Sequence, residues 1–574
     1  MLRLLTLALC CLLVACQSTT HYPSADRILL GEIITMDPEQ PTAEAVAVKD
    51  GKIIAVGTHD EVWKHVGEWT SIVQMHEGIM LPGFIDPHSH FLQMVDVARW
   101  ANVSSPPAGD VSNIEQLVGA LKQLRDEREQ QAGDWLVAWG YDSGRITDGR
   151  ELTKDDLDRD FGDQPVMVIH VSGHGGVLNS AALRIVGIDE SSEAPPGGII
   201  RRKPNSREPD GFLMETAFLP AYLALPRPAL EERLDALKEA QRSYAAQGIT
   251  TLQEGATDEK GLALLDEANR RELLKLDIVA QPLWVDAAEL IGRRDFRGYR
   301  GRLKLGGIKF IVDGSPQGKT ALFSEPYLTG GPAGEEDWRG EPNISKDELE
   351  LLVRHCAAND VRVYAHCNGD GAIDMLLDAL DALPEGVVAE RPVIIHSQFV
   401  RPDQLERYVE LGCTPSYFTN HAYYWGDVHR RNLGEERAAF LSPCATSKHM
   451  GIRFTNHTDF MVTPLNPLFT VLTASERRQR TSEVLGPDER ISVYDALHAI
   501  TVDAAYQCGE EDSKGSITVG KRADFVVLSA NPLEREGAAL LQIRTWQTYK
   551  DGVLVWELEG IPHPFVRRLR EKWM

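Results

Sequence analysis

Hydrophobic residues recur with two different periods along the chain, and the change of period divides it into parts. Residues 27–35 and 44–57 are short runs rich in Ile, Val and Ala, and Asp50-Gly51 between two apolar runs predicts a β-hairpin. From Leu81 onward, short apolar strands alternate with amphipathic helices, which is the order expected of parallel βα units. Near the end of the chain the pattern returns to β without intervening helices, at residues 515–520, 523–528 and 552–556.

Helices in the middle of the chain are predicted by their caps and their apolar period. Residues 112–131 begin with Ser112 and Glu115 at the spacing of a capping box, and Ser345 and Glu348 repeat that spacing at the start of residues 345–358. Further helices are predicted at residues 230–246, 372–383, 402–411 and 492–500. Strands are predicted at residues 135–139, 165–171, 249–252, 278–282, 307–312, 361–365, 393–395 and 452–455.

This order of elements predicts an α/β protein with two structural units. Residues 82–500 are expected to form a TIM-like (β/α)8 barrel, and residues 26–81 together with 501–560 a small β-sandwich built from both chain ends. Residues 102–246 are too long for one crossover between neighbouring strands, so we predict an insertion near the mouth of the barrel.

Composition narrows the class of protein and of partner. The chain has 574 residues, of which 43% are hydrophobic, as in a globular protein with a sizeable core. Its 85 Asp and Glu outnumber its 60 Lys and Arg, and this net charge of -25 disfavours nucleic acid as a partner. The eight cysteines are not spaced as a disulfide framework. We therefore expect a small-molecule ligand, and the pattern gives no signal for an oligomeric state.

The first 15 residues differ from the rest of the chain. Arg3 precedes the apolar run at residues 4–14, which is too short to remain as a membrane span and is typical of an export signal. The run ends in Leu13-Val14-Ala15-Cys16, which resembles the lipobox of bacterial lipoproteins. This resemblance implies cleavage after a signal peptide of residues 1–15, a lipid anchor on Cys16 and a tether over residues 16–25. With Gln17 next, it also implies the cell envelope, at the outer membrane facing the periplasm. The alternative is a buried apolar N-terminal segment.

Candidate chemistry begins where the first β segment ends. After Pro82-Gly83, the chain places His88 and His90 two residues apart, so both imidazoles point to the same side of an extended backbone. Such a pair is weak evidence for a metal site on its own, because paired histidines are more often surface or core residues.

Four later apolar runs also carry or precede a side chain that is able to bind a metal. These are Lys309, His366, His396 and Asp459. Each has an ordinary alternative: an ion-paired lysine, core histidines and a helix cap. Because all four lie in or after predicted strands, as His88 and His90 do, we predict a metal site at one end of the barrel.

The same residues resemble the amidohydrolase superfamily, and within it the amidohydrolase 3 group that includes YtcJ-like proteins and N-substituted formamide deformylase. Two further stretches support the resemblance, Lys309 through Asp313-Gly314-Ser315 and Gly515-Ser516-Ile517 with residues 520–524. It extends from about residue 26 to about residue 557. It implies a metal-dependent hydrolase fold of the barrel and sandwich type.

The resemblance also implies a binuclear centre, usually zinc. His88 and His90 would bind one ion, His366 and His396 the other, and an N-carboxylated Lys309 would bridge the two. Asp459 would contact one ion and act as the general base and then the general acid. The implied reaction is hydrolysis of a non-peptide carbon–nitrogen bond in an amide, N-acyl or cyclic amide compound, by attack of a metal-bridging hydroxide.

Several assignments stay open. His174, which lies with Asn179 in a motif of the group, and Asp313 are candidate substrate contacts, and we expect specificity in residues 142–155 and 416–427. His457, next to Asp459, is equally compatible with packing. One alternative function is a mononuclear zinc deaminase of the same superfamily, which does not need Lys309. Another is a periplasmic binding lipoprotein that keeps the scaffold without turnover.

Overall fold

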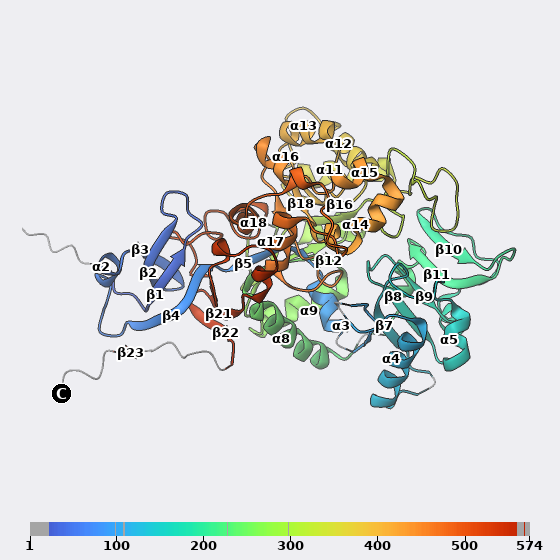
Figure 1. Cartoon of the computed structure of the whole chain (residues 1–574), viewed down its shortest axis with the longest axis horizontal. Coiled ribbons are helices and arrows are strands. Elements are labelled where there is room, and N and C mark those ends of the chain that lie inside the picture. The colour runs from blue at the N-terminus through green and yellow to red at the C-terminus, as the bar shows by residue number, and fades with distance from the viewer. Residues whose placement is uncertain are drawn as a thin grey trace, which may run out of the picture.

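The computed structural model describes residues 22–97, 99–106, 109–131, 133–226, 228–296, 298–559 and 567–568. The predicted signal peptide and Cys16 lie outside the described residues. Figure 1 shows three parts in a row: a sheet of blue and red strands, a central part with green to orange helices, and a teal part at the other end. No helix in the described ranges is long and apolar enough to cross a bilayer.

Strands from both chain ends form one eight-stranded sheet, ordered β22-β21-β20-β4-β1-β2-β3, with β23 paired to β4. Their bounds are Arg27–Ile34 (β1), Thr42–Lys49 (β2), Lys52–Gly57 (β3), Ser71–Pro82 (β4), Phe525–Leu528 (β20), Thr545–Lys550 (β21), Val553–Glu557 (β22) and Arg567–Arg568 (β23). The predicted hairpin is confirmed, because β2 and β3 pair antiparallel around Asp50 and Gly51, whose φ angles are 50° and 74°.

Residues 515–520 are not the strand that their apolar pattern predicts. Gly515 and Gly520 have φ angles of 89° and 95°, which interrupt an extended backbone. The segment still joins the sheet, because Gly520 donates to the carbonyl of Ile53 and Ile53 donates to that of Lys521. The edge strand β3 is thereby tied to the chain that enters β20.

The central part contains two parallel sheets, one of four strands ordered β14-β13-β12-β5 and one of five ordered β15-β16-β17-β18-β19. Their bounds are Phe84–Ser89 (β5), Ile249–Thr257 (β12), Asp277–Pro282 (β13), Leu303–Leu305 (β14), Ile308–Ile311 (β15), Val363–Cys367 (β16), Val393–His396 (β17), Thr414–Tyr417 (β18) and Thr455–Asn456 (β19). Two contacts run between these sheets. Leu283 forms a parallel bridge with Lys309, and the Asp459 N–H donates to the His88 carbonyl over 3.2 Å.

Helices connect the parallel strands, and the largest apolar core lies between these helices and the strands. Their bounds are Phe91–Val97 (α3), Leu230–Ala246 (α8), Glu259–Arg270 (α9), Ala287–Arg293 (α10), Lys346–Ala358 (α11), Asp370–Asp381 (α12), Pro402–Leu411 (α13), Asn420–Leu433 (α14), Glu435–Ala439 (α15), Cys444–His449 (α16), Pro467–Glu476 (α17), Val493–Ala499 (α18) and Val502–Gln507 (α19). The predicted helices at residues 230–246 and 402–411 have the observed bounds. The five cysteines of the described ranges are buried and unpaired.

The third part is a six-stranded sheet with apolar clusters of its own, ordered β10-β11-β9-β8-β7-β6. Its elements are Ala101–Asn102 (β6), Ile114–Glu127 (α4), Leu136–Tyr141 (β7), Lys154–Phe161 (α5), Val166–His170 (β8), Gly175–Leu178 (β9), Ser180–Val186 (α6), Gly198–Arg202 (β10), Pro209–Glu215 (β11) and Leu219–Leu223 (α7). The capping box predicted at Ser112 is wrong. Asn113 is the N-cap of α4, and its side chain accepts from the Gln116 N–H.

Candidate active site

Two histidines at the end of β5 approach one carboxylate oxygen. The Nε2 atoms of His88 and His90 lie 3.3 and 3.4 Å from Oδ1 of Asp459. His88 is fully buried, and its ring lies against Gly255 of β12, where an added Cβ would come within 2.0 Å of the ring. The glycine therefore makes room for the first histidine. Asp86 ties β5 to the segment after β19, because it accepts from the Thr458 hydroxyl over 2.6 Å.

His366 is the penultimate residue of β16 and His396 is the last residue of β17, and their ring centroids lie 4.6 Å apart. Nδ1 of His366 lies 3.1 Å from Oδ1 of Asp313. Nδ1 of His396 lies 3.1 Å from Nε2 of His457. Burial holds the pKa of both ligand candidates, His366 and His396, well below the usual histidine value. They are therefore neutral, which is the form that binds metals.

Lys309 lies in β15, at the same end of the parallel sheets as the four histidines. It is 1% exposed, and its Nζ atom makes no hydrogen bond within the described part of the chain. Burial lowers the pKa of Lys309 to about 7. A buried amine without a partner is costly, so this side chain requires an additional group or a functional reason.

Buried polar atoms without partners test whether a metal fits these residues. Both ring nitrogens of His88, Nζ of Lys309 and Oδ1 of Asp459 are buried without a hydrogen bond of normal geometry. Two groups of potential ligand atoms lie within 4.8 Å of one another, His88, His90 and Asp459 in one and His396, His457 and Asp459 in the other. Such donor sets with unused lone pairs fit divalent metal ions.

The compact groups of ligand atoms do not coincide fully with the six predicted ligands. His366 comes close to His396 but belongs to neither of the two compact groups, whereas His457, which the sequence leaves open between packing and the site, belongs to one. The available signal for His457 was its position two residues before Asp459, at the end of the same strand.

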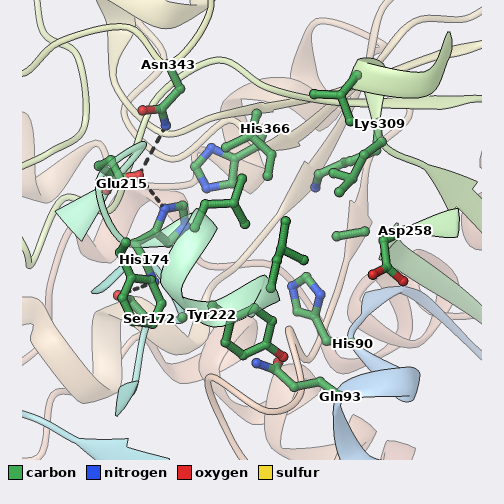
Figure 2. A pocket seen from close by; sticks show the side chains of 18 of the residues that line it. His90, Gln93, Ser172, His174, Glu215, Tyr222, Asp258, Lys309, Asn343 and His366 are labelled. Atoms are coloured by element: carbon green, nitrogen blue, oxygen red, sulfur yellow. Dashed lines mark hydrogen bonds and ion pairs between the residues drawn. The ribbon is translucent and has the colours of Figure 1, made fainter. Parts of the chain in front are cut away.

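A cavity of about 400 Å³ opens beside these residues (Figure 2). One wall comes from the ends of the parallel strands, with His90, Lys309, His366, His396 and Asp459. The facing wall comes from the third sheet and α7, with Ser172, His174, Glu215, Phe218 and Tyr222 among its residues.

Two predicted substrate-contact regions lie away from the lining of this cavity. Within the described residues, neither 142–155 nor 416–427 contributes to it, and Nε1 of Trp425 donates to Oδ2 of Asp142 over 3.2 Å. Their role in specificity stays a prediction. Asp313 does not line the cavity either. It is fully buried, and the backbone N–H groups of Leu322, Asn368 and Gly369 all donate to its carboxylate. Asp313 thus orients His366, and its contact with a substrate stays a prediction. His174 does line the cavity.

Comparison with known proteins gives a family. A model of the Amidohydrolase family matches residues 73–556. N-substituted formamide deformylase of Arthrobacter pascens is 26% identical, over 93% of this chain and 98% of that protein. Putative amidohydrolase YtcJ of Bacillus subtilis is 28% identical, over 92% of this chain and 98% of that protein.

A solved structure, an uncharacterized metal-dependent hydrolase from Pyrococcus horikoshii, has a similar fold. Its TM-score is 0.71 at 23% identity, and the match covers 89% of this chain and 98% of that one. The resemblance inferred from the sequence is confirmed by the family model and by both curated relatives. The chain belongs to the amidohydrolase family and is a hydrolase that acts on carbon–nitrogen bonds.

Proposed function

We propose that this protein is a metal-dependent hydrolase of an amide or formamide whose nitrogen carries an apolar substituent. The observation that carries the proposal is the meeting of four imidazoles, Asp459 and an unpartnered Lys309 beside one cavity. The apolar side of the cavity, with Phe218, Tyr222 and Trp284, suits such a substituent. The deformylase named above, whose name specifies N-substituted formamides, supports the same class.

The proposal includes the architecture around the site. The two parallel sheets, which touch through Leu283 and Lys309 on one side and through His88 and Asp459 on the other, form the TIM-like barrel over residues 82–500. The sheet formed by strands from both chain ends folds over to give the composite β-sandwich. The cavity then lies at the C-terminal ends of the barrel strands, where such enzymes place their chemistry.

In this proposal these donors would hold two zinc ions. His88 and His90 would bind one ion, His366 and His396 would bind the other, and an N-carboxylated Lys309 would supply further oxygen ligands. The low pKa of Lys309 supports this role, because the neutral amine is the form that takes up carbon dioxide. When bound, such ions polarise a carbonyl and lower the pKa of water.

Asp459 moves the proton. Burial alone would raise the pKa of Asp459, but the imidazoles around it, His396 first among them, hold it well below the usual value. The carboxylate is therefore ionised. As water adds to the carbonyl carbon, Asp459 accepts its proton and then returns that proton to the nitrogen as the carbon–nitrogen bond breaks.

A chelator tests the proposal directly. Removing the metal should abolish hydrolysis of a panel of N-benzyl and N-butyl formamides and acetamides, and added zinc should restore it. Undiminished activity in the metal-free protein would contradict the proposal. Binding of these amides without any turnover by the zinc-loaded protein would favour the binding lipoprotein instead.

The variant Lys309→Ala distinguishes a two-ion site from a one-ion site. We expect this variant to retain less metal and to lose at least about 100-fold in kcat, a loss typical of removing one group that stabilises the transition state. Elemental analysis gives the metal content, and Lys346→Ala, on the exposed face of α11, is the matched control. One ion per chain in the wild-type protein, with full activity of Lys309→Ala, would favour the mononuclear deaminase.

The location of the protein is also a proposal, and it rests on the lipobox-like stretch alone. We propose a lipid anchor at Cys16 that holds the enzyme at the outer membrane, facing the periplasm. Metabolic labelling with a radioactive fatty acid should mark the wild-type protein and not Cys16→Ala, and label in both would contradict the anchor.

A further inference from the structure

One wall of the cavity is a tight turn between β8 and β9. Its residues, Ser172-Gly173-His174, follow Val171, one residue after β8 ends at His170. The Gly173 N–H donates to the His170 carbonyl, and Gly173 has a φ angle of 75°, which favours glycine. Ser172 fastens the turn from inside, because its hydroxyl lies 2.8 Å from Nδ1 of His170 and accepts from the His174 N–H. The backbone that carries His174 is therefore fixed.

The side chain of His174 is fixed as well, by Glu215 at the end of β11. Nδ1 of His174 lies 2.9 Å from Oε2 of Glu215, and the Glu215 N–H donates to the His174 carbonyl over 2.8 Å (Figure 2). Asn343 donates to the same carboxylate oxygen over 3.1 Å. Glu215 itself is 8% exposed, and an added Cβ at Gly314 would come within 2.1 Å of its other oxygen.

These contacts leave His174 with one ring nitrogen for the cavity. Nδ1 is engaged by Glu215, so Nε2 is the atom that remains for a ligand. The His174 side chain is 17% exposed and lines the cavity, and its ring centroid lies 5.0 Å from that of His366. The imidazole thus lies beside His366, one of the candidate metal ligands.

We propose that His174 is a catalytic residue supplied by the third sheet, with Glu215 and Asn343 as its positioning residues. Its Nε2 atom hydrogen-bonds the reacting amide group of the substrate, while Glu215 and Asn343 hold the ring in that orientation. Three segments far apart in sequence share this task, and none of the three residues belongs to the predicted metal ligands. The inference rests on the proposed function, because the ligand of Nε2 is the amide that is hydrolysed.

The experiment measures kcat and KM for hydrolysis of N-benzylformamide by zinc-loaded protein. We expect His174→Ala and Glu215→Ala each to lower kcat by about 100-fold, within the range for a positioned hydrogen-bonding group, with little change in KM. The double variant should be no slower than His174→Ala, because Glu215 acts through His174. Glu215→Gln keeps an acceptor for Nδ1 and should recover part of the rate. Metal content should remain that of the wild-type protein.

Asp503→Asn is the matched control. It removes the carboxylate from another His pair, in which Nδ1 of His498 lies 2.8 Å from Oδ2 of Asp503, on α18 and α19 outside the cavity. We expect its kcat and KM to be unchanged.

Other results would overturn the inference. If the losses from His174→Ala and Glu215→Ala multiplied in the double variant, Glu215 would not act through His174. A rise in KM alone would place His174 at the distal part of the substrate. Loss of metal in these variants would make them structural supports of the metal site. No hydrolysis by the wild-type protein would instead overturn the proposed function, and the role of His174 with it.

Discussion

At the scale of single residues, three side chains of the cavity lie on strained backbone. Glu215, His396 and Asp459 have φ angles of 51°, 70° and 46°, in the left-handed region that residues other than glycine rarely adopt. Each such conformation costs about 1–3 kcal/mol and persists where the surroundings enforce it. At these positions the surroundings are buried hydrogen bonds and neighbouring strand ends. All three side chains line the cavity, and strained residues of this kind cluster at functional sites.

Gly255 shows how a residue without a side chain shapes the site. Gly255→Ala places a Cβ within 2.0 Å of the His88 ring, so the imidazole has to move. We expect bound metal and activity to fall about 10- to 100-fold, the range for changes that misplace a metal ligand. Elemental analysis and amide hydrolysis measure the two losses.

The control for this substitution is Gly119→Ala, in the interior of α4, where an added Cβ meets no atom within 4 Å. It should stabilise the protein by about 0.5–1 kcal/mol and leave the metal content unchanged. Normal metal content in Gly255→Ala would show that His88 is not held by this contact.

At the scale of elements, the sequence pattern and the structure differ at the start of α4. The pattern predicts Ser112 as the N-cap, and the structure has Asn113 there. Asn113→Ala removes the acceptor of the Gln116 N–H and should cost about 1 kcal/mol of unfolding free energy. Ser112→Ala should change stability by less than about 0.5 kcal/mol, because Asn113 is the cap. Urea unfolding of both variants measures the difference. A larger loss in Ser112→Ala would restore the capping box that the sequence pattern predicts.

Most elements of the central part follow from local pattern, and their exceptions have physical causes. The helix α8 and the strand β17 begin where their apolar periods begin. The strand β18 was missed because its sequence, Thr-Pro-Ser-Tyr, is neither apolar nor alternating, although all four residues are buried. The strands β10 and β11 were missed because their pairing depends on a partner across the third sheet.

At the scale of the whole molecule, a buried ionic cluster joins the sheet of the chain ends to the parallel strands. Asp277 of β13 lies 2.7 Å from Nζ of Lys514 and 2.8 Å from that of Lys550 in β21, and all three side chains are nearly inaccessible. Lys550 also pairs with Asp524 at 2.8 Å. The contact fixes the two parts of the chain relative to each other.

Asp277→Asn should therefore be strongly destabilising. It leaves two buried lysines without their shared carboxylate, a loss of about 3–5 kcal/mol. Burial alone would raise the pKa of Asp277, but Lys514 and Lys550 hold it far below the usual value. A depressed folded pKa gives stability that is complete above the unfolded pKa of about 3.9 and is lost as the pH falls. The difference between wild type and variant in urea unfolding should thus shrink below about pH 4.

The comparison variant for this cluster is Asp266→Asn, whose carboxylate pairs with Arg294 at 2.7 Å but is 43% exposed. We expect less than about 1 kcal/mol from its loss, with no comparable pH dependence. Equal effects of the two substitutions would show that the cluster does not clamp the two parts.

The sequence by itself determined most strands and helices of the central part, the family and the residue types that converge at the strand ends. These follow from local periodicity and from the rule that parallel strands end on one side. Only the tertiary structure decided that Gly255 makes room for His88, that Asp313 orients His366, and that His174 and Glu215 form the facing wall. Such partners lie far apart in the chain, and no local pattern records which side chain another one meets.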